Sequence, residues 1–273
     1  MKTWAVTNQK GGSGKTTSAV NLAAAAGELG RRVLVVDLDP QASASAWLGT
    51  PDGGRGLLDV LTEGTALADL VVETGTAGVD LVPSSAWLAN VDRALAGEVG
   101  AELAFRDAVK ALPKRWDLVL VDCPPALGLL TVSALAAVRE VVVPVETSAM
   151  ALAGLAGLLR TVERVRDRLN PGLAVRAVLP CRVDARTNLA RDVVAHLRER
   201  FGSVVTETVI RESVRVREAW SFGQPVTTYD PRGAGAEDYR AAARELLGLD
   251  PDAAAPSVEV LDRTEAPSPE PSP

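Results

Sequence analysis

The sequence has few of the residues that carry redox, metal and disulfide chemistry. Its 273 residues include two cysteines, Cys123 and Cys181, and one histidine, His196. Two cysteines cannot build a disulfide framework, and they lack the spacing of a metal site, so we expect both to be small buried residues in a reducing cytoplasm. A single histidine argues against histidine-based catalysis and histidine-rich metal sites. We expect it on the surface of a helix.

Long apolar runs are also missing. Hydrophobic residues make up 47% of the chain, enough for a sizeable core, but no uncharged apolar stretch reaches the roughly 18 residues of a membrane span. The first residues, "MKTWAVTNQKGG", run directly into a predicted strand and a glycine loop and do not resemble a signal peptide. These features favour a globular protein without membrane attachment.

Charge is distributed unevenly along the chain. The net charge is −6, yet residues 151–220 contain 13 arginines and 8 acidic residues, a local balance of +5, so the remainder carries −11. A basic segment within an acidic protein indicates one positively charged face, which is compatible with a nucleic-acid partner.

Short β-branched runs alternate with segments of helical periodicity. This alternation predicts βαβ units, and therefore an α/β fold with a mostly parallel, twisted central sheet and helices on both faces. The predicted strands are 3–6, 33–37, 117–122, 140–145 and 174–180, and the predicted helices are 15–29, 86–111, 127–138, 148–169 and 185–200. One domain is expected over residues 1–249. Residues 250–273 are rich in proline, serine and acidic residues and are expected to form a disordered tail.

The stretch "TNQKGGSGKTT" (7–17) lies between the first predicted strand and the first predicted helix. Its glycines allow the backbone N–H groups to curl around an anion, and the helix N-terminus adds positive potential. In such a phosphate-binding loop Lys15 would contact the β- and γ-phosphates of a nucleotide and the Thr16 hydroxyl would bind Mg²⁺. The residues assigned to nucleotide binding are Lys10, Gly11, Gly12, Ser13, Gly14, Lys15, Thr16 and Thr17.

Three aspartates follow predicted strands. Asp37 and Asp39 end "VLVVDLD", and Asp122 ends the apolar strand "DLVLVD" in the manner of a Walker B motif. Strand ends at one edge of a parallel sheet form ligand sites, so we expect Asp37 and Asp122 to bind Mg²⁺ through water. The alternative for the first pair is an Asp-Pro turn with no catalytic role. Cys123 adjoins this region, but no activated thiolate is evident.

The glycine loop departs from the standard pattern because Gln9 replaces its first glycine and Lys10 opens the motif. In this respect the chain resembles the deviant Walker A subgroup of P-loop NTPases, with the signature KGGxGK[ST]. The resemblance implies that Lys10 reaches across a two-fold axis onto the nucleotide of a second subunit. ATP would then hold a homodimer together, and hydrolysis would dissolve it. It also implies that Asp39 positions the attacking water, which makes Lys10, Lys15 and Asp39 the expected catalytic residues.

Further segments resemble ParA-type partition ATPases of the small form, with coverage from Lys2 to Leu249. These segments are "DCPPALGLLTVSAL", "DARTNLARDVV" and "GQPVTTYDPRGAGAEDY". The resemblance implies an ATPase that is weak alone and stimulated by a ParB-type centromere-binding partner. It further implies that the ATP dimer binds non-specific DNA, localises to the nucleoid and drives chromosome or plasmid partition. Arg186 and Arg215 match family arginines implicated in DNA contact.

Several positions differ from the family pattern. Arg211 follows Ile210 where the family often has Ile-Pro-Arg, and Arg182 follows Cys181 where threonine and methionine are common. Arg182 and Arg211 are therefore candidate contacts to the nucleotide, and the mode of adenine binding stays open. The segment "ASASAWLG" places Trp47 after the loop that follows the second strand. Trp47 either responds to nucleotide or fills the core.

Other ATPases share this fold and give alternative interpretations. A membrane-surface ATPase like MinD would need a basic amphipathic C-terminal helix, whereas the tail here is acidic. A redox ATPase like the nitrogenase iron protein would need cluster-binding cysteines. A biotin-pathway type of synthetase would need its own substrate pocket. An ATPase that positions another cargo along the nucleoid cannot be distinguished from a partition ATPase by sequence.

Overall fold

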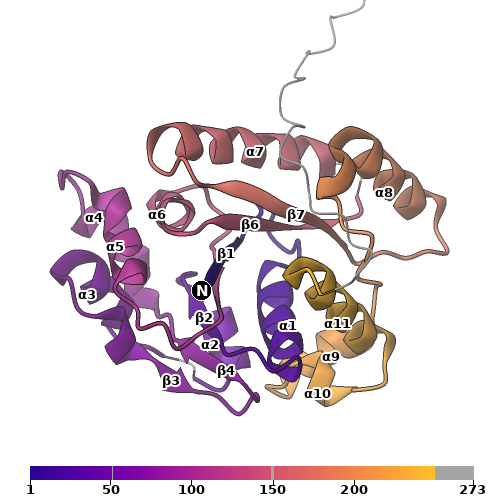
Figure 1. Ribbon diagram of the computed structural model, residues 1–273, viewed down its shortest axis with the longest axis horizontal. Coiled ribbons are helices and arrows are strands. Elements are labelled where there is room, and N and C mark those ends of the chain that lie inside the picture. Colours follow the sequence, from indigo (N-terminus) through magenta and orange to yellow (C-terminus); the bar gives the residue numbers. More distant parts are fainter. Residues whose placement is uncertain (51, 149–150, 250–273) are drawn as a thin grey trace, which may run out of the picture.

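A computed structural model describes residues 1–50, 52–148 and 151–249 of the chain. At its centre is a seven-stranded sheet with the order β3-β4-β2-β5-β1-β6-β7 (Figure 1). All strand pairs are parallel except β3 with β4. The strands are β1 (Lys2–Val6), β2 (Val33–Asp37), β3 (Val72–Glu73), β4 (Val79–Val82), β5 (Leu118–Asp122), β6 (Glu140–Glu146) and β7 (Ala174–Cys181). The predicted α/β fold with a mostly parallel sheet is confirmed, while the predicted tail lies outside the described residues.

Helices cover both faces of the sheet (Figure 1). The α-helices are α1 (Lys15–Glu28), α2 (Ser43–Trp47), α3 (Gly56–Glu63), α4 (Val91–Ala94), α5 (Ala104–Lys110), α6 (Leu129–Ala137), α7 (Ala151–Arg168), α8 (Asn188–Phe201), α9 (Val214–Ser221), α10 (Val226–Tyr229) and α11 (Ala234–Leu247). The 3-10 turns are η1 (Leu67–Leu70), η2 (Ala86–Asn90), η3 (Ala101–Leu103) and η4 (Gly202–Val204). His196 is exposed on α8, as expected.

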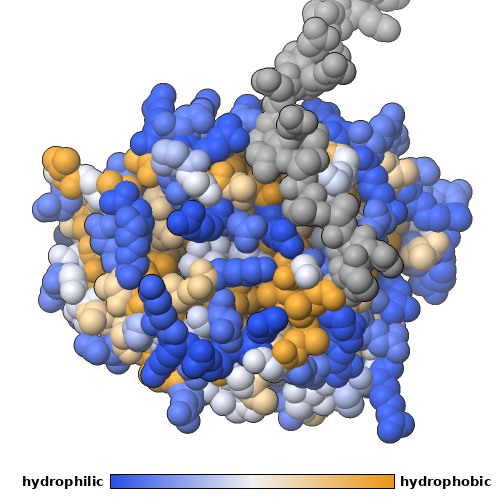
Figure 2. Space-filling view, viewed as in Figure 1, coloured by the Kyte–Doolittle hydropathy of each residue, from blue (hydrophilic) through white to orange (hydrophobic). Residues whose placement is uncertain are grey.

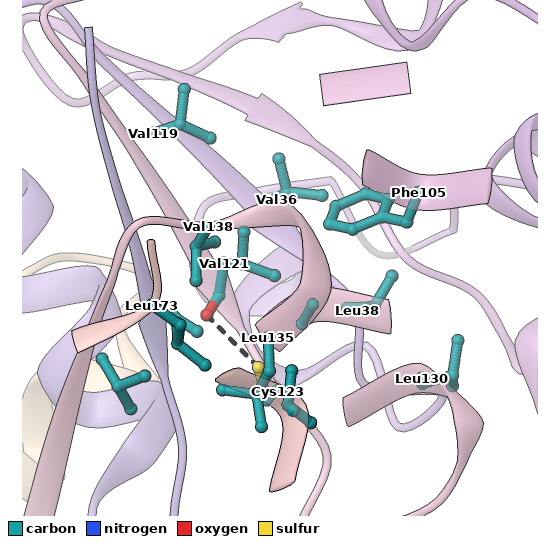
Figure 3. Packing of buried hydrophobic residues seen from close by; sticks show 14 of the residues in the cluster. Val36, Leu38, Phe105, Val119, Val121, Cys123, Leu130, Leu135, Val138 and Leu173 are labelled. Carbon is teal, nitrogen blue, oxygen red and sulfur yellow. Dashed lines mark hydrogen bonds between the residues drawn. The ribbon is translucent and has the colours of Figure 1, made fainter. Parts of the chain in front are cut away.

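The strands divide their side chains between two cores. Along β2, Val33 and Val35 face the core that includes α1, α9, α10 and α11, while Leu34 and Val36 face the core that includes α3, α5, α6, α7 and α8. This alternation follows from the two-residue period of a strand, and the uniformly apolar sequences follow from burial on both faces. Figure 3 shows part of the second core, where Phe105 packs with residues of β2, β5 and α6.

The predicted long helix over 86–111 is wrong. Its residues form η2, α4, η3 and α5 instead, and the break between α4 and η3 contains Gly97 and Gly100. Both glycines have left-handed backbones, with φ values of +87° and +78°, which are incompatible with a continuous right-handed helix. Strands β3 and β4 were not predicted, because both are short and lie among polar residues and glycines.

The surface is mostly hydrophilic in the view of Figure 2, including the outer side of α7 and α8. Within the described residues, no helix combines the length and hydropathy that crossing a membrane requires. Exposed aromatic side chains nevertheless occur on and next to α9, namely Trp220 and Phe222. Phe222 stacks on Tyr229 of α10 with 5.0 Å between the ring centroids.

Candidate functional site

The glycine loop connects β1, which lies between β5 and β6, to the N-terminus of α1. Asn8 holds its start: the Asn8 Nδ2 donates to the Pro144 carbonyl at 2.7 Å, and its Oδ1 accepts from the Lys10 backbone N–H at 3.1 Å. Gly12 and Gly14 have φ values of +74° and +87°, a region in which other residues are strained. Gly14 directly precedes α1. The loop therefore has the curled backbone and the helix junction that the sequence predicts.

Lys15, the first residue of α1, is buried and lines a cavity at the carboxyl edge of the sheet. Its Nζ donates to the Lys10 carbonyl at 3.3 Å. Burial lowers the pKa of Lys15, and the nearby Asp122 and Asp39 carboxylates oppose this effect. A buried ammonium with one long hydrogen bond is an unsatisfied cation, and a phosphate oxygen would supply the missing contacts.

Asp37 and Asp122 lie opposite each other, because β2 and β5 pair in a register that aligns these two residues. The Asp37 Oδ2 accepts from both the backbone N–H and the hydroxyl of Ser45, at 2.8 and 2.7 Å. Burial raises the pKa of Asp37 to about 6, and the Ser45 hydrogen bonds oppose the rise. The first turn of α2 therefore fixes the orientation of this carboxylate.

Asp122 is completely buried, and neither of its carboxylate oxygens has a hydrogen-bond partner among the residues that the structure describes. Burial raises the pKa of Asp122 well above its usual range, and the Asp37 carboxylate adds to the rise. A buried acceptor without a partner is costly unless a ligand completes it. A water molecule bound to Mg²⁺ would donate to it, and this metal typically uses one or two carboxylates together with water and phosphate oxygens. That preference fits the absence of a cluster of three metal-ligating side chains among the described residues.

Asp39 follows β2 and lines the same cavity as Lys15. Its Oδ1 accepts from the Gln41 N–H at 3.0 Å, its backbone N–H donates to Asp37 Oδ1 at 3.2 Å, and its carbonyl accepts from the Ser84 hydroxyl at 2.7 Å. These contacts hold Asp39 beside Asp37, as the sequence predicts. Cys123, by contrast, points into the second core beside Leu135, with its Sγ 3.7 Å from the Val121 carbonyl (Figure 3), and burial raises its thiol pKa well above the usual range. Cys123 therefore has no part in the cavity.

The cavity has a volume of about 510 Å³ and is open to solvent. One wall comes from the glycine loop and the start of α1, and the opposite wall comes from β7, the segment before α9, α9 itself and α11. Its lining comprises Gly11, Gly12, Gly14, Lys15, Thr16, Thr17, Asp39, Trp47, Pro125, Cys181, Arg182, Ile210, Arg211, Glu212, Ser213, Val216, Arg217, Trp220 and Tyr239. Most of the residues predicted to bind nucleotide are thus brought together around one cavity.

Lys10 behaves differently from Lys15. Among the described residues that line the cavity, Gly11 is present but Lys10 is not. The Lys10 ammonium turns away to form an ion pair with Glu146 at 2.5 Å and a hydrogen bond with the Ser148 hydroxyl at 3.2 Å, and 40% of the side chain is exposed. Sequence reasoning missed Glu146. Its position at the end of β6, on the same edge of the sheet as Asp37 and Asp122, could have revealed it.

The two arginines proposed as nucleotide contacts both line the cavity, and both are engaged in ion pairs. Arg182 has a left-handed backbone, φ +55°, and bridges Glu146 at 2.9 Å and Glu212 at 3.1 Å. The backbone N–H of Arg211 donates to Asp238 at 2.9 Å, and its guanidinium binds the same carboxylate at 2.6 Å. Arg211 is therefore bound to α11, whereas Arg182 joins Glu146 at the end of β6 to Glu212 in the cavity lining.

The arginines proposed to contact DNA lie on exposed surfaces. The Arg186 side chain is 90% exposed and forms two hydrogen bonds with Asp184, at 2.9 and 2.8 Å. These bonds lower the pKa of Asp184 to about 2. The Arg215 side chain, on α9, is 60% exposed and pairs with Glu218 at 2.8 Å. Both guanidinium groups are thus exposed and paired with carboxylates close to them in the sequence.

Comparisons with known proteins identify the family to which this chain is related. A model of the family described as "AAA domain" matches residues 1–175. The chain is 41% identical to the sporulation initiation inhibitor protein Soj of Bacillus subtilis, covering 89% of this chain and 96% of that protein. It is also 41% identical to the chromosome partitioning protein ParA of Caulobacter vibrioides, covering 92% of this chain and 96% of that protein.

Solved structures show the same fold. Cobyrinic acid a,c-diamide synthase from Mycobacterium smegmatis, determined with a bound ATP analogue and magnesium, is similar with a TM-score of 0.79 and 33% identity, over 90% of this chain and 94% of that one. The cell division ATPase MinD of Pyrococcus furiosus is similar with a TM-score of 0.74 and 27% identity, over 91% and 99%. The two relatives cover 89% and 92% of this chain, and the span of the family model contains the glycine loop and the three aspartates. The chain therefore belongs to the ParA/Soj family of P-loop ATPases.

Proposed function

We propose that this protein is an ATP-dependent dimerising switch that binds non-specific DNA as its ATP dimer. In this proposal it hydrolyses ATP to drive chromosome or plasmid partition with a ParB-type partner, and it localises to the nucleoid. One observation carries the proposal: the two lysines of the glycine loop diverge. Lys15 faces the cavity of its own subunit, while the ammonium of Lys10 lies outside that cavity near the surface.

Within one subunit, the loop N–H groups and Lys15 would hold the triphosphate, and the Thr16 hydroxyl with Asp37 and Asp122 would hold Mg²⁺, the aspartates through water. When bound, Mg²⁺ supplies positive charge against the β- and γ-phosphates. Asp39 lies beside this group with its carboxylate fixed by Gln41, so it can orient the attacking water and accept a proton.

Lys10 is superfluous for binding ATP within one subunit. Its side chain leaves the loop toward the protein surface, where a second subunit placed face to face would present its own triphosphate. A lysine buried against phosphates is stable only while that negative charge is present. ATP would thus stabilise the dimer, and loss of the γ-phosphate would weaken it.

DNA binding would follow from dimerisation. Two subunits double the number of exposed arginines, Arg186 and Arg215 among them, that meet one DNA backbone. Because each neutralised phosphate adds to affinity through counterion release, a dimer binds measurably where a monomer does not.

The decisive test compares alanine variants of three lysines by analytical ultracentrifugation with ATP. Lys10→Ala is expected to bind ATP but to sediment as a monomer, and Lys15→Ala is expected to lose ATP binding itself. Lys114→Ala, at an exposed lysine away from the loop, is the control and should dimerise like the wild type. An ATP-dependent dimer of Lys10→Ala would refute the proposed role of Lys10.

A second function within the family is the positioning of a different cargo. The nucleotide chemistry would be the same, and only the adaptor would differ. A pull-down with the Asp39→Ala variant, expected to be trapped with ATP, distinguishes the two. Recovery of a ParB-type protein supports partition, and recovery of another adaptor favours the alternative.

A further inference from the structure

The short helix α2 connects the Asp39 loop to a distant part of the chain. In the middle of α2, Ser45 binds Asp37 through both its N–H and its hydroxyl, and the Ser45 Oγ also accepts from the Ser84 N–H at 2.8 Å. Any movement of the Asp37 carboxylate that follows nucleotide binding or hydrolysis must therefore move α2 or break these bonds.

At its C-terminal residue, Trp47, α2 is bound to the linker between α9 and α10. The Trp47 Nε1 donates to the Gln224 carbonyl at 2.8 Å, across 177 residues of sequence. The backbones also approach closely, since a Cβ at Gly223 would lie only 3.7 Å from the Trp47 carbonyl. Only 3% of Trp47 is exposed, and its side chain lines the nucleotide cavity.

The first residue of α10, which directly follows this linker, is bound to the helix that follows the glycine loop. The Asn21 Oδ1, on α1, accepts from the Val226 N–H at 2.7 Å, and the Asn21 Nδ2 donates to the Thr17 carbonyl at 2.7 Å. The segment that follows α9 is thus held at two points: its linker is bound to α2, and the start of α10 is bound to α1.

The element held in this way is α9, which carries Arg215 and Arg217 and ends beside the half-exposed Trp220. Arg217 also pairs with Glu212 at the edge of the cavity, at 3.5 Å. We propose that Trp47 is a positioning residue that couples the Asp39 loop to α9, so that nucleotide state sets how Arg215 meets DNA. The inference rests on the proposed function and specifies how its two activities communicate.

The test replaces the indole by a ring without the N–H group. Trp47→Phe is compared with Trp116→Phe, a control closely matched in chemistry: Trp116 is also 3% exposed and donates its Nε1 at 2.8 Å, to Asp80. Trp116 precedes β5, at the end of the strand opposite Asp122, and does not line the cavity. Loss of one hydrogen bond corresponds to roughly a two- to tenfold change in an equilibrium.

For Trp47→Phe, which alters one wall of the cavity, we expect any loss of ATP affinity to be smaller than the loss of DNA affinity, and the ATP dimer to stay intact by ultracentrifugation. DNA affinity of the ATP form should fall by about five- to tenfold at fixed salt. Trp116→Phe should change none of these quantities by more than about twofold. Unchanged DNA affinity in Trp47→Phe would overturn the inference. An equal loss of ATP affinity would also overturn it, because Trp47 would then act as a pocket wall.

Hydrogen exchange separates this inference from the proposed function, because it needs no DNA. ATP is expected to change amide exchange over residues 214–224 in the wild type, and Trp47→Phe should abolish the change. If the wild type binds no DNA but shows this exchange response, the proposed function fails while the coupling stands. If ATP does not change amide exchange over residues 214–224 in the wild type, the proposed coupling is refuted, whatever the variants show. Trp47→Tyr, which fills more of the indole volume, replaces the phenylalanine variant should the latter not fold.

Discussion

Lys10 and Glu146 lie 136 residues apart in the sequence, and their side chains form an ion pair of 2.5 Å. The Glu146 carboxylate also binds Arg182 at 2.9 Å, so it joins the opening lysine of the glycine loop to the residue after β7. In the proposed dimer Lys10 must leave Glu146 before it can reach the nucleotide of the second subunit. Glu146 therefore competes with dimerisation.

The first prediction concerns this competition. Glu146→Gln removes the negative charge and should strengthen the ATP-dependent dimer by roughly two- to fivefold, because a half-exposed ion pair contributes up to about 1 kcal/mol. Sedimentation over a dilution series measures the dimer dissociation constant. Glu212→Gln is the control, since Glu212 binds Arg182 but not Lys10. A weaker Glu146→Gln dimer would mean that Glu146 supports the interface rather than competing with it.

The second prediction is a trade between stability and activity at Asp122. Its two oxygens are buried without partners in the described part of the chain, so in the absence of metal the carboxylate destabilises the fold. Asp122→Asn should increase the free energy of unfolding of the nucleotide-free protein at pH 8 by about 1–3 kcal/mol. The unfolding temperature should rise by a few degrees as a result. The substitution should also abolish Mg²⁺-dependent ATP hydrolysis.

Asp117→Asn is the control for this experiment, because Asp117 flanks the opposite end of β5, where its exposed carboxylate accepts from the Arg32 N–H at 2.9 Å. It should leave the unfolding temperature unchanged or slightly lower. Calorimetry with and without Mg²⁺ provides the measurement. A destabilised Asp122→Asn protein that keeps full ATPase activity would show that Asp122 has a structural role instead.

The third prediction is a pH dependence that arises at Asp37. Its pKa is raised by burial to about 6, above the value near 3.8 of an exposed aspartate. Between these values the folded state binds more protons than the unfolded state, so this contribution to stability is complete below pH 4 and is lost as the pH rises through 6. The expected loss is about 3 kcal/mol. Denaturant titrations of wild type and Asp37→Asn in EDTA should converge or cross between pH 4 and 7, and parallel profiles would contradict the raised pKa.

The sequence predicted which residues gather near the cavity better than it predicted the contacts between distant segments of the chain. Glycines, Lys15 and strand-terminal aspartates could be identified because short local patterns determine their geometry, and parallel strands then bring them to one edge. The predicted long helix over 86–111 was wrong because a local pattern of apolar residues was misleading there. Its apolar spacing suits a helix, but Gly97 and Gly100 interrupt it with left-handed backbones.

Contacts between distant segments could not be predicted in this way. The pairing of Lys10 with Glu146 depends on the neighbouring positions of β1 and β6, and the bond from Trp47 to Gln224 depends on how α9 and α10 pack beside α1. No local pattern encodes either arrangement. The sequence therefore indicated Trp47 as an unusual residue without indicating its partner.

The last prediction concerns the contact with DNA. If Arg186 and Arg215 each neutralise one phosphate per subunit, removing either arginine from a dimer removes two contacts. The slope of log affinity against log salt should then become shallower by about 2, since each contact contributes about 0.9. Arg93→Ala, at an exposed arginine of α4 outside the basic segment, should keep the wild-type slope. Because Asp184 holds the Arg186 guanidinium, Asp184→Asn should free it and raise DNA affinity at low salt. Filter binding or fluorescence anisotropy with random-sequence duplex DNA at several salt concentrations measures both the DNA affinity and its salt slope. Equal slopes for the wild type, Arg186→Ala and Arg215→Ala would place the DNA-binding surface elsewhere on the protein.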